Sequence, residues 1–344
     1  MPININGNEI ILRELSEVIQ SSNLNFLFGA GTSFPFLPVL GNIETELNKA
    51  DSDALREAQY KKYCTDVMLP NKNVIDADLS GDAKYQETKK SYSNFFQSAA
   101  DILLRRKSTI LSKQANVFTT NIDVLMENIL EELQIEYNDG FSGKFTPTFS
   151  IANFKKSILQ RSLHYEHVSE IPLFNIIKVH GSLTWKLDVT NSKVTFSHKL
   201  DHFDDSISKL GGDDFKKAYN NIMVVNPEEA KHLESVLNVY YSELLRIYSS
   251  ELEKENATLF VVGFSMEDRH IREITLRAAK SNPTLRIFIC SSQGSSAKME
   301  TKMEVRQHPN ILVFETDAPS AKFTLKYLVE HVFDKISLEK DDEE

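Results

Sequence analysis

The sequence is poor in cysteine and lacks long apolar runs. Its 344 residues include two cysteines, Cys64 and Cys290, which are far apart in the chain. This separation excludes a disulfide framework and a zinc site with CxxC spacing, so we expect both to be buried, reduced thiols. No run of about 18 apolar residues occurs, so no transmembrane helix is predicted. The polar stretch from Met1 to Glu9 predicts no secretory leader.

Positive charge is also in short supply. Lysine and arginine number 39 against 49 aspartates and glutamates, which gives a formal net charge of −10. Neutralising nucleic-acid phosphates requires clusters of basic residues, so no direct nucleic-acid binding is expected. No acidic cluster with convincing metal-ligand spacing is visible, which disfavours a nuclease and predicts no metal site. We expect a cytoplasmic protein that does not engage a membrane.

Short apolar runs alternate with helical patterns along the chain. Runs that are apolar throughout predict strands buried on both faces, as in the parallel sheets of α/β proteins. The runs lie at residues 24–28, 116–119, 175–179, 258–262, 285–290 and 311–314, and helical spacing occurs at 9–21, 123–133, 228–254, 269–280 and 318–333. The predicted fold class is therefore α/β, with a doubly wound, mostly parallel sheet.

The organisation predicted around this sheet is a single domain over residues 1–336. A polar, strand-poor region at 50–112 is interpreted as a helical insertion, with a loop at 71–81 between helical pieces. A further helix is expected from about Gly41, a hairpin within 184–196 and an irregular loop at 137–149. Residues 337–344 are predicted to form an acidic, disordered tail.

A glycine-rich turn follows the first predicted strand. It reads Gly29-Ala30-Gly31-Thr32-Ser33. Glycines let a backbone approach a pyrophosphate closely, and successive amide groups can cradle it. The spacing differs from GxGxxG, so a tight strand-to-helix turn without a ligand explains this motif about as well.

Polar residues also follow later predicted strands. Thr120, Asn121 and Asp123 come after the second run, although Asp123 is equally suited to cap the next helix. His180 precedes a glycine after the third run, a position where a histidine is often simply packed. The segment Gly263-Phe264-Ser265 resembles a second phosphate turn, and Asp268 and His270 beyond it fit the first turn of a helix.

The order of these motifs resembles the sirtuin family. The shared pattern is Gly-Ala-Gly-x-Ser, then Thr-x-Asn-x-Asp, then His-Gly, then Gly-x-Ser, and it spans residues 24–292. The stretch from Gly263 to Ile271 is similar to the bacterial sirtuin-like proteins of antiphage defence. Ligands of doubly wound sheets bind at the carboxyl ends of strands, so motifs far apart in sequence can meet there.

The resemblance implies a site for NAD. Asn121 and Asp123 would face the nicotinamide ribose, and His180 would be the general base. The pyrophosphate, ribose and adenine contacts would come from Gly29, Ala30, Gly31, Thr32, Ser33, Thr120, Gly263, Phe264, Ser265 and Ser291.

Departures from the deacylating sirtuins shape the predicted reaction. The chain cannot form their four-cysteine zinc module, and Phe34-Pro35-Phe36-Leu37-Pro38 lacks the arginine of their first motif. The resemblance then implies an NAD+ hydrolase (NADase) that cleaves the nicotinamide–ribose bond and acts in antiviral defence by NAD depletion, an abortive infection. It further implies a homo-oligomer and a HerA-type ATPase partner. An NAD-dependent deacylase and a non-catalytic module that binds NAD or ADP-ribose remain alternatives.

Overall fold

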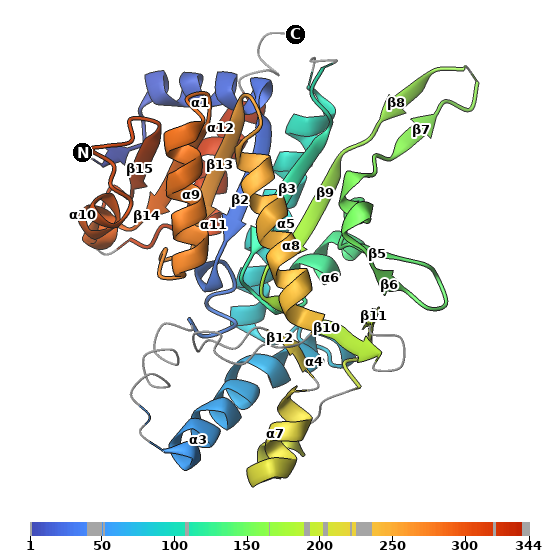
Figure 1. The fold of residues 1–344 in the computed structure, drawn as a ribbon. Coiled ribbons are helices and arrows are strands. Elements are labelled where there is room, and N and C mark those ends of the chain that lie inside the picture. Colours follow the sequence, from blue (N-terminus) through green and yellow to red (C-terminus); the bar gives the residue numbers. More distant parts are fainter. Residues whose placement is uncertain are drawn as a thin grey trace.

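The six apolar runs form the centre of one parallel sheet in the computed structural model, which describes residues 2–39, 50, 52–106, 110–164, 166–188, 193–201, 206–220, 222–224, 236–318 and 321–338. The eight strands lie in the order β1-β15-β14-β13-β2-β3-β9-β4 (Figure 1). Their bounds are β1 Ile3–Asn4, β2 Asn23–Phe28, β3 Gln114–Thr119, β4 Tyr137–Asn138, β9 Leu173–Lys178, β13 Ala257–Val262, β14 Arg286–Ser291 and β15 Ile311–Glu315. This arrangement confirms the predicted doubly wound α/β class.

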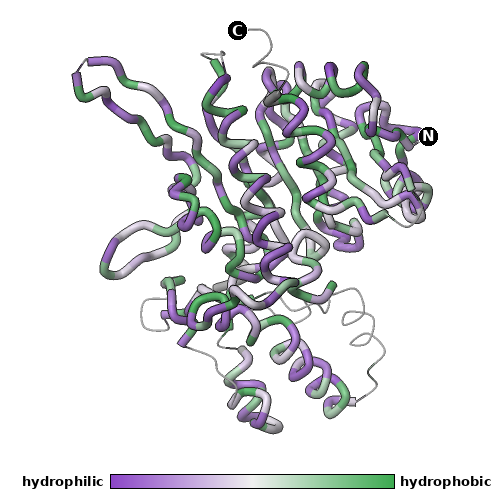
Figure 2. The backbone as a smooth tube through the Cα atoms, turned by 180° about the vertical axis from the view of Figure 1, so that it is seen from behind, coloured by the Kyte–Doolittle hydropathy of each residue, from purple (hydrophilic) through white to green (hydrophobic). Residues whose placement is uncertain are grey.

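Alternate residues of each central strand enter separate cores on the two faces of the sheet. In β2, Phe26 and Phe28 belong to one core and Leu27 to the other, as the two-residue period of a strand requires. The first face carries α1 (Glu9–Ser21), α5 (Ala83–Leu104), α6 (Leu125–Glu132) and the closing segment of α11 (Leu325–Leu328), a π-helical turn (Val329–Phe333) and α12 (Asp334–Leu338). The second face carries α8 (Val236–Leu252), α9 (Arg269–Ser281) and α10 (Gln293–Lys302). Hydrophobic stretches run along the central strands in Figure 2.

The region predicted as a helical insertion contributes to the main core. In α5, Tyr92, Phe95 and Phe96 are fully buried, and the Phe95 ring meets the Phe26 ring edge-on with centroids 5.0 Å apart. Before it lie α3 (Asp53–Tyr63), a π-helical turn (Cys64–Met68) and α4 (Leu69–Asp76). The predicted loop at 71–81 is therefore wrong up to Asp76. The buried Asn71 side chain accepts a hydrogen bond from the Val124 amide at 2.9 Å, a tertiary contact that local composition does not reveal.

A second, smaller sheet is antiparallel, and its strands alternate along the chain with those of the main sheet. Its order is β12-β10-β11-β6-β5, with bounds β5 Phe141–Ser142, β6 Thr148–Phe149, β10 Gly181–Asp188, β11 Lys193–Phe196 and β12 Ile222–Val224. It confirms the predicted hairpin within 184–196. The irregular loop expected at 137–149 instead contains paired strands, because aromatic rings there pack together: Phe149 and Trp185 have centroids 4.7 Å apart. The carboxyl ends of the parallel strands point toward this part of the molecule (Figure 1).

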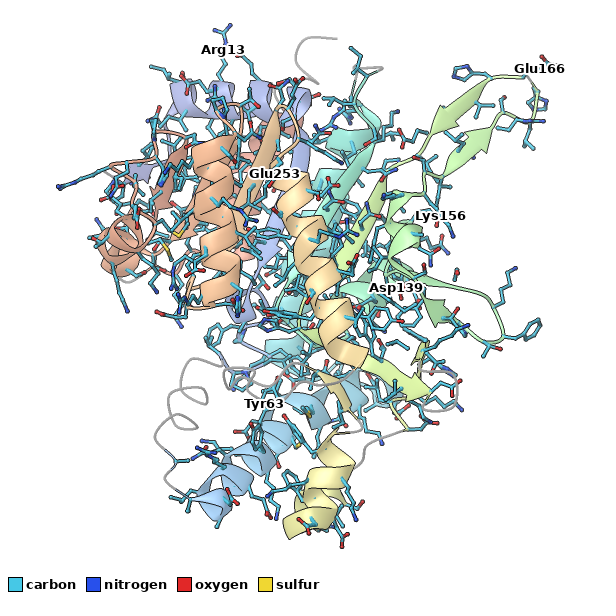
Figure 3. All side chains as sticks on the ribbon, viewed as in Figure 1. Arg13, Tyr63, Asp139, Lys156, Glu166 and Glu253 are labelled. Atoms are coloured by element: carbon cyan, nitrogen blue, oxygen red, sulfur yellow. The ribbon has the colours of Figure 1, made fainter. Side chains whose placement is uncertain are left out.

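The remaining elements are short. The strands β7 (Leu159–Arg161) and β8 (Val168–Glu170) form a hairpin that projects from the body, with Glu166 near its tip (Figure 3). Single-turn helices η1 (Ala30–Thr32), Ile151–Lys155 and Ile207–Lys209, and helix α7 (Gly212–Asn220), complete the described elements. None of the described helices combines the length and apolar character needed to cross a bilayer. The helix expected from Gly41, the start of the 228–254 helix and residues 339–344 lie outside the described residues.

Both cysteines are buried free thiols, as predicted. Burial raises the pKa of Cys64 to about 12 and raises the pKa of Cys290 as well.

The closing helix begins at Leu325 rather than near Ala318, where the sequence pattern predicted its start.

A ladder of asparagines fixes the register of three central strands. Asn25, Asn116 and Asn175 lie directly opposite one another on β2, β3 and β9. Asn116 donates to the Asn25 side-chain oxygen at 2.9 Å, and Asn175 donates to the Asn116 oxygen at 2.9 Å. A shift of one residue would break both bonds, so the ladder holds the carboxyl ends of these strands level.

Candidate active site at the carboxyl edge of the sheet

The two glycine turns meet where the strand order changes direction. The chain visits β2, β3 and β9 on one side and then returns to β13, β14 and β15 on the other, so β2 and β13 are neighbours. The amide of Gly31 donates to the Gly263 carbonyl at 3.0 Å. A Cβ on Gly29 would stand 2.6 Å from the Gly263 oxygen, and Gly263 has φ +63 with room for no Cβ, since one would stand 2.6 Å from the Thr32 nitrogen. These glycines are needed for close packing of one turn on the other, whatever they bind.

Asn121 is tied to the first turn by its amide group. Its Nδ2 donates to the Gly29 carbonyl at 3.1 Å, to Thr32 Oγ1 at 3.3 Å and to Ser33 Oγ at 3.0 Å. Ser33 Oγ in turn donates to Asp123 Oδ2 at 2.7 Å. Because Asn121 and Asp123 follow β3 directly, the register of β3 beside β2 brings these two motifs together.

Tyr92 completes this network from helix α5. Its hydroxyl donates to Thr32 Oγ1 at 2.8 Å and lies 3.2 Å from Ser33 Oγ. Burial raises the pKa of the Tyr92 hydroxyl, so it stays neutral and able to donate. No signal in the sequence identified Tyr92, because it lies in a helix separated from the turn by about 60 residues and resembles an ordinary core aromatic.

His180 is paired with a carboxylate. Its Nε2 lies 3.0 Å from Asp268 Oδ2, and Asp268 Oδ1 accepts the Ile271 amide at 3.0 Å as the N-cap of α9. The helix-start interpretation of Asp268 is therefore correct but incomplete. Burial alone would raise the pKa of the Asp268 carboxyl, whereas the hydrogen bond from His180 holds this pKa below its ordinary value. His270, the neighbour in sequence, is exposed.

The predicted residues differ in how much they reach solvent. Asn121 is 5% exposed and Asp123 is 2% exposed, whereas the His180 side chain is 22% exposed. Ala30, Gly31, Thr120, Gly263 and Phe264 are half-buried, and Ser265 is exposed. The inner wall of the edge is thus an amide–hydroxyl–carboxylate network, and the outer rim carries His180 and the two turns.

Ser291 stands apart from this network. It ends β14, the strand beyond β13, and its hydroxyl lies 3.1 Å from Ser295 Oγ within its own turn. The structure therefore bonds the first, second and fourth motifs together directly or through backbone, and joins His180 to the fourth through Asp268. Ser291 shares with these motifs only its position at the carboxyl edge of the parallel sheet.

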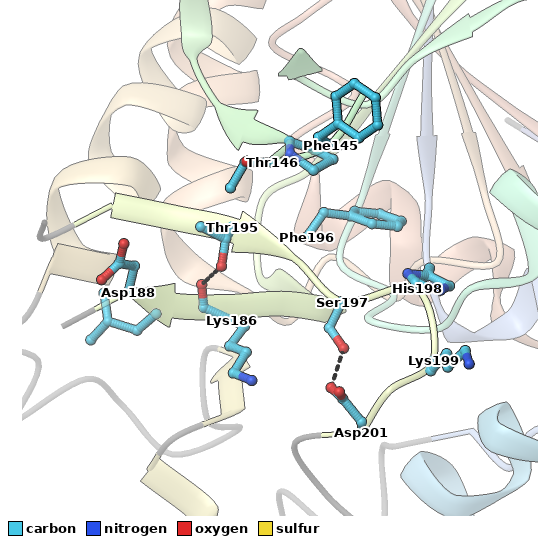
Figure 4. Close-up of a pocket in the computed structure, with 12 residues that line it drawn as sticks. Phe145, Thr146, Lys186, Asp188, Thr195, Phe196, Ser197, His198, Lys199 and Asp201 are labelled. Atoms are coloured by element: carbon cyan, nitrogen blue, oxygen red, sulfur yellow. Dashed lines mark hydrogen bonds between the residues drawn. The ribbon is translucent and has the colours of Figure 1, made fainter. Parts of the chain in front are cut away.

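The two described surface cavities lie elsewhere. One of about 510 Å³ is lined by Lys186, Phe196, His198 and neighbours on the antiparallel sheet (Figure 4). The other, of about 570 Å³, lies against α4 and includes Lys72 and Asp76. Neither is lined by a predicted site residue. Within the described ranges, no group of three His, Cys, Asp or Glu side chains is arranged to hold a metal ion.

Comparison with known proteins identifies a domain family. The family described as "SIR2-like domain" matches residues 115–314. A solved structure described as a crystal structure of a Sir2 homologue–NAD complex is similar over 95% of this chain and 94% of its own, at 13% sequence identity and a TM-score of 0.47. No curated protein matches the sequence.

Proposed function

Because this chain belongs to the SIR2-like domain family, we propose that it is an NAD+ hydrolase that cleaves the nicotinamide–ribose bond to give nicotinamide and ADP-ribose. The observation that carries the proposal is the pairing of His180 with Asp268 at 3.0 Å, at the same sheet edge as the fixed Asn121 amide. This edge includes the β2–β13 switch point, where doubly wound sheets bind dinucleotides.

Asn121 supplies the stabilising dipole in this proposal. Nicotinamide leaves NAD+ as a neutral molecule, and positive charge develops on the ribose as in glycoside hydrolysis. Three acceptors hold the Asn121 amide nitrogen, which fixes the amide plane and directs its carbonyl oxygen away from them. A preoriented oxygen needs no reorganisation when the charge develops. The Asp123 carboxylate, which is linked to the Asn121 amide nitrogen through Ser33 Oγ, adds negative charge to the site.

His180 supplies the base. An ionised Asp268 can only accept a hydrogen bond, so the Nε2 of His180 carries the proton and Nδ1 keeps the lone pair. A water oxygen bonds to the ribose carbon while a water proton moves to Nδ1, and the electrons of the broken C–N bond leave with nicotinamide. Asp268 stabilises the imidazolium that forms.

The remaining contacts of NAD are assigned by position along the edge. Gly29 to Ser33 and Thr120 would meet the pyrophosphate and ribose, Gly263 to Ser265 the phosphates or the adenosine ribose, and Ser291 the adenine end. The order of β3, β2, β13 and β14 in the sheet supports this direction. No metal takes part in the proposed reaction.

The proposed biological role is antiphage defence by NAD depletion in the cytoplasm. Unchecked hydrolysis of NAD would kill the cell, so such an enzyme has to be held inactive until infection. We propose that assembly into a homo-oligomer, together with a HerA-type ATPase, provides this control. The support is the resemblance of the stretch from Gly263 to Ile271 to defence-associated relatives.

The test is nicotinamide release from NAD+ by the purified protein, with and without a co-encoded ATPase and with and without an acetylated peptide. We expect release without peptide in the wild type, and none in Asn121→Ala or His180→Ala, both still folded. His167→Ala is the matched control, because His167 is exposed and directly precedes β8 of the projecting hairpin. Full activity in both site variants would remove the mechanism, and release only with peptide would indicate a deacylase.

A further inference from the structure

A buried lysine lies beneath the proposed site. Lys178 is the last residue of β9, two positions before His180, and is 3% exposed. Its Nζ lies 2.7 Å from Glu127 Oε1 and donates to Ser182 Oγ at 3.3 Å. The same Nζ also donates to the main-chain carbonyl of Asp123. An ammonium has three N–H donors, and these contacts supply an acceptor for each.

The acceptors belong to different parts of the site. The Asp123 carbonyl is on the loop that carries Asn121, whereas Ser182 lies at the start of β10, two residues after His180. Glu127 lies in the first turn of α6, the helix that follows the Asn121 loop. The single ammonium therefore bridges the loop of the stabilising amide and the turn of the base.

One further bond joins the Asn121 loop to the start of β10. The Leu183 amide donates to the Ile122 carbonyl at 3.0 Å. This backbone bond and the Lys178 ammonium therefore connect the Asn121 loop and the start of β10 at two points. Two connections restrict the separation of the two segments more than one connection does.

The burial of the Lys178–Glu127 ion pair argues against a purely stabilising role for Lys178. Burying an ammonium and a carboxylate carries a desolvation cost that well-packed apolar residues avoid. Among the described residues, Glu127 Oε2 has no hydrogen-bond partner, so this pair is incompletely satisfied. The ammonium itself reaches three acceptors, and two of them, the Asp123 carbonyl and Ser182 Oγ, lie beside Asn121 and His180 in sequence.

We propose that Lys178 is a positioning residue, which holds the Asn121 loop and the His180 turn at the separation that nicotinamide release requires. The assignment rests on the proposed NAD+ hydrolysis. The competing explanation is that Lys178 does no more than neutralise Glu127. The two explanations differ in what happens when both charges are removed together.

The experiment compares Lys178→Met, the double variant Lys178→Met/Glu127→Leu and Arg106→Met in the full-length protein. Arg106 is the matched control: it is 5% exposed and donates to the Ser112 and Ile19 carbonyls at 3.0 and 2.9 Å, at the opposite end of the sheet. Thermal unfolding gives Tm, and steady-state nicotinamide release from NAD+ gives kcat and KM separately.

For Lys178→Met we expect a lower Tm and a kcat reduced about 10- to 100-fold per folded molecule, the scale of a small misplacement of reacting groups, with KM nearly unchanged. The double variant should recover Tm but not kcat. Arg106→Met should lower Tm and leave kcat unchanged.

Recovery of kcat together with Tm in the double variant would overturn the assignment, because Lys178 would then be only a charge partner. If Lys178→Met does not fold, the double variant alone decides between the two. A wild type that releases no nicotinamide, either alone or with the co-encoded ATPase, overturns the proposed function and this assignment with it. An active wild type with unimpaired variants overturns only the assignment.

Discussion

Replacing Asp268 by asparagine separates the two roles of this side chain. Oδ1 caps α9 through the Ile271 amide, and Oδ2 accepts from His180, each at 3.0 Å. Asparagine caps helices about as well as aspartate, so Asp268→Asn keeps the cap and removes the charge that faces the imidazole. Asp268→Ala removes both and serves as the comparison.

The size of the effect follows from the hydrogen bond that is lost. A hydrogen bond to a charged group contributes about 1.5–3 kcal/mol, and each 1.4 kcal/mol or so changes a rate tenfold. The His180 and Asp268 side chains are 22% and 17% exposed, which places this bond near the lower end. We expect kcat for nicotinamide release to fall roughly tenfold in Asp268→Asn. Asp268→Ala should be less stable than Asp268→Asn by about 0.5–2 kcal/mol, because it also loses the helix cap.

The lowered pKa of Asp268 also predicts a pH dependence of stability. The pKa of Asp268 is lower in the folded protein than its ordinary value, so ionisation of this carboxyl favours the folded state. This contribution is fully present above the unfolded pKa of about 3.9 and is lost as the pH falls through the lower folded value. Urea unfolding at neutral pH should show wild type more stable than Asp268→Asn, and the difference should shrink in acid.

The result that would refute this reasoning is an Asp268→Asn variant with wild-type kcat across the pH range. His180 would then need no carboxylate to set its tautomer. A loss of activity that only follows the loss of folded protein, equally in both variants, would mean that Asp268 acts as a helix cap alone.

Other predictions concern packing at and below the site. Gly263→Ala should destabilise the fold by about 1–3 kcal/mol and impair nicotinamide release, since its φ is positive and a Cβ has no room; Gly294→Ala, where nothing lies within 4 Å, should be neutral or stabilising in urea unfolding. Asn116→Leu should cost about 1–3 kcal/mol by leaving ladder partners unpaired, and equal stability would show that the ladder does not fix register. Lys178→Met should cost about 3–5 kcal/mol in unfolding free energy, because it leaves Glu127 buried without its cation.

The strands were predictable because the apolar residues that bury each strand are consecutive in the sequence. Each central strand is a short run of residues with no polar face, and all six observed strands overlap the predicted runs within about two residues, the usual uncertainty of element ends. The asparagines in three of them, such as Asn116, look like interruptions in sequence. They are explained only when the strands lie side by side and the amides pair.

The site was predictable only in part. Asn121, His180 and the two glycine turns could be identified because each follows a strand, and parallel strands end at one edge. Their roles in binding or catalysis stay predictions. Tyr92 and Lys178 were not identified at all, because a buried tyrosine and a strand-end lysine carry no local mark of what they contact.

The sequence by itself determined the fold class and the set of loops that share an edge, because strand burial and the placement of polar residues after strands are properties of neighbouring residues. The tertiary structure decided which side chains meet: Asp268 with His180, Ser33 with Asp123, and Lys178 with two loops at once. Such pairs join residues tens of positions apart. They form only after the sheet has fixed the order and register of its strands, which no local pattern encodes.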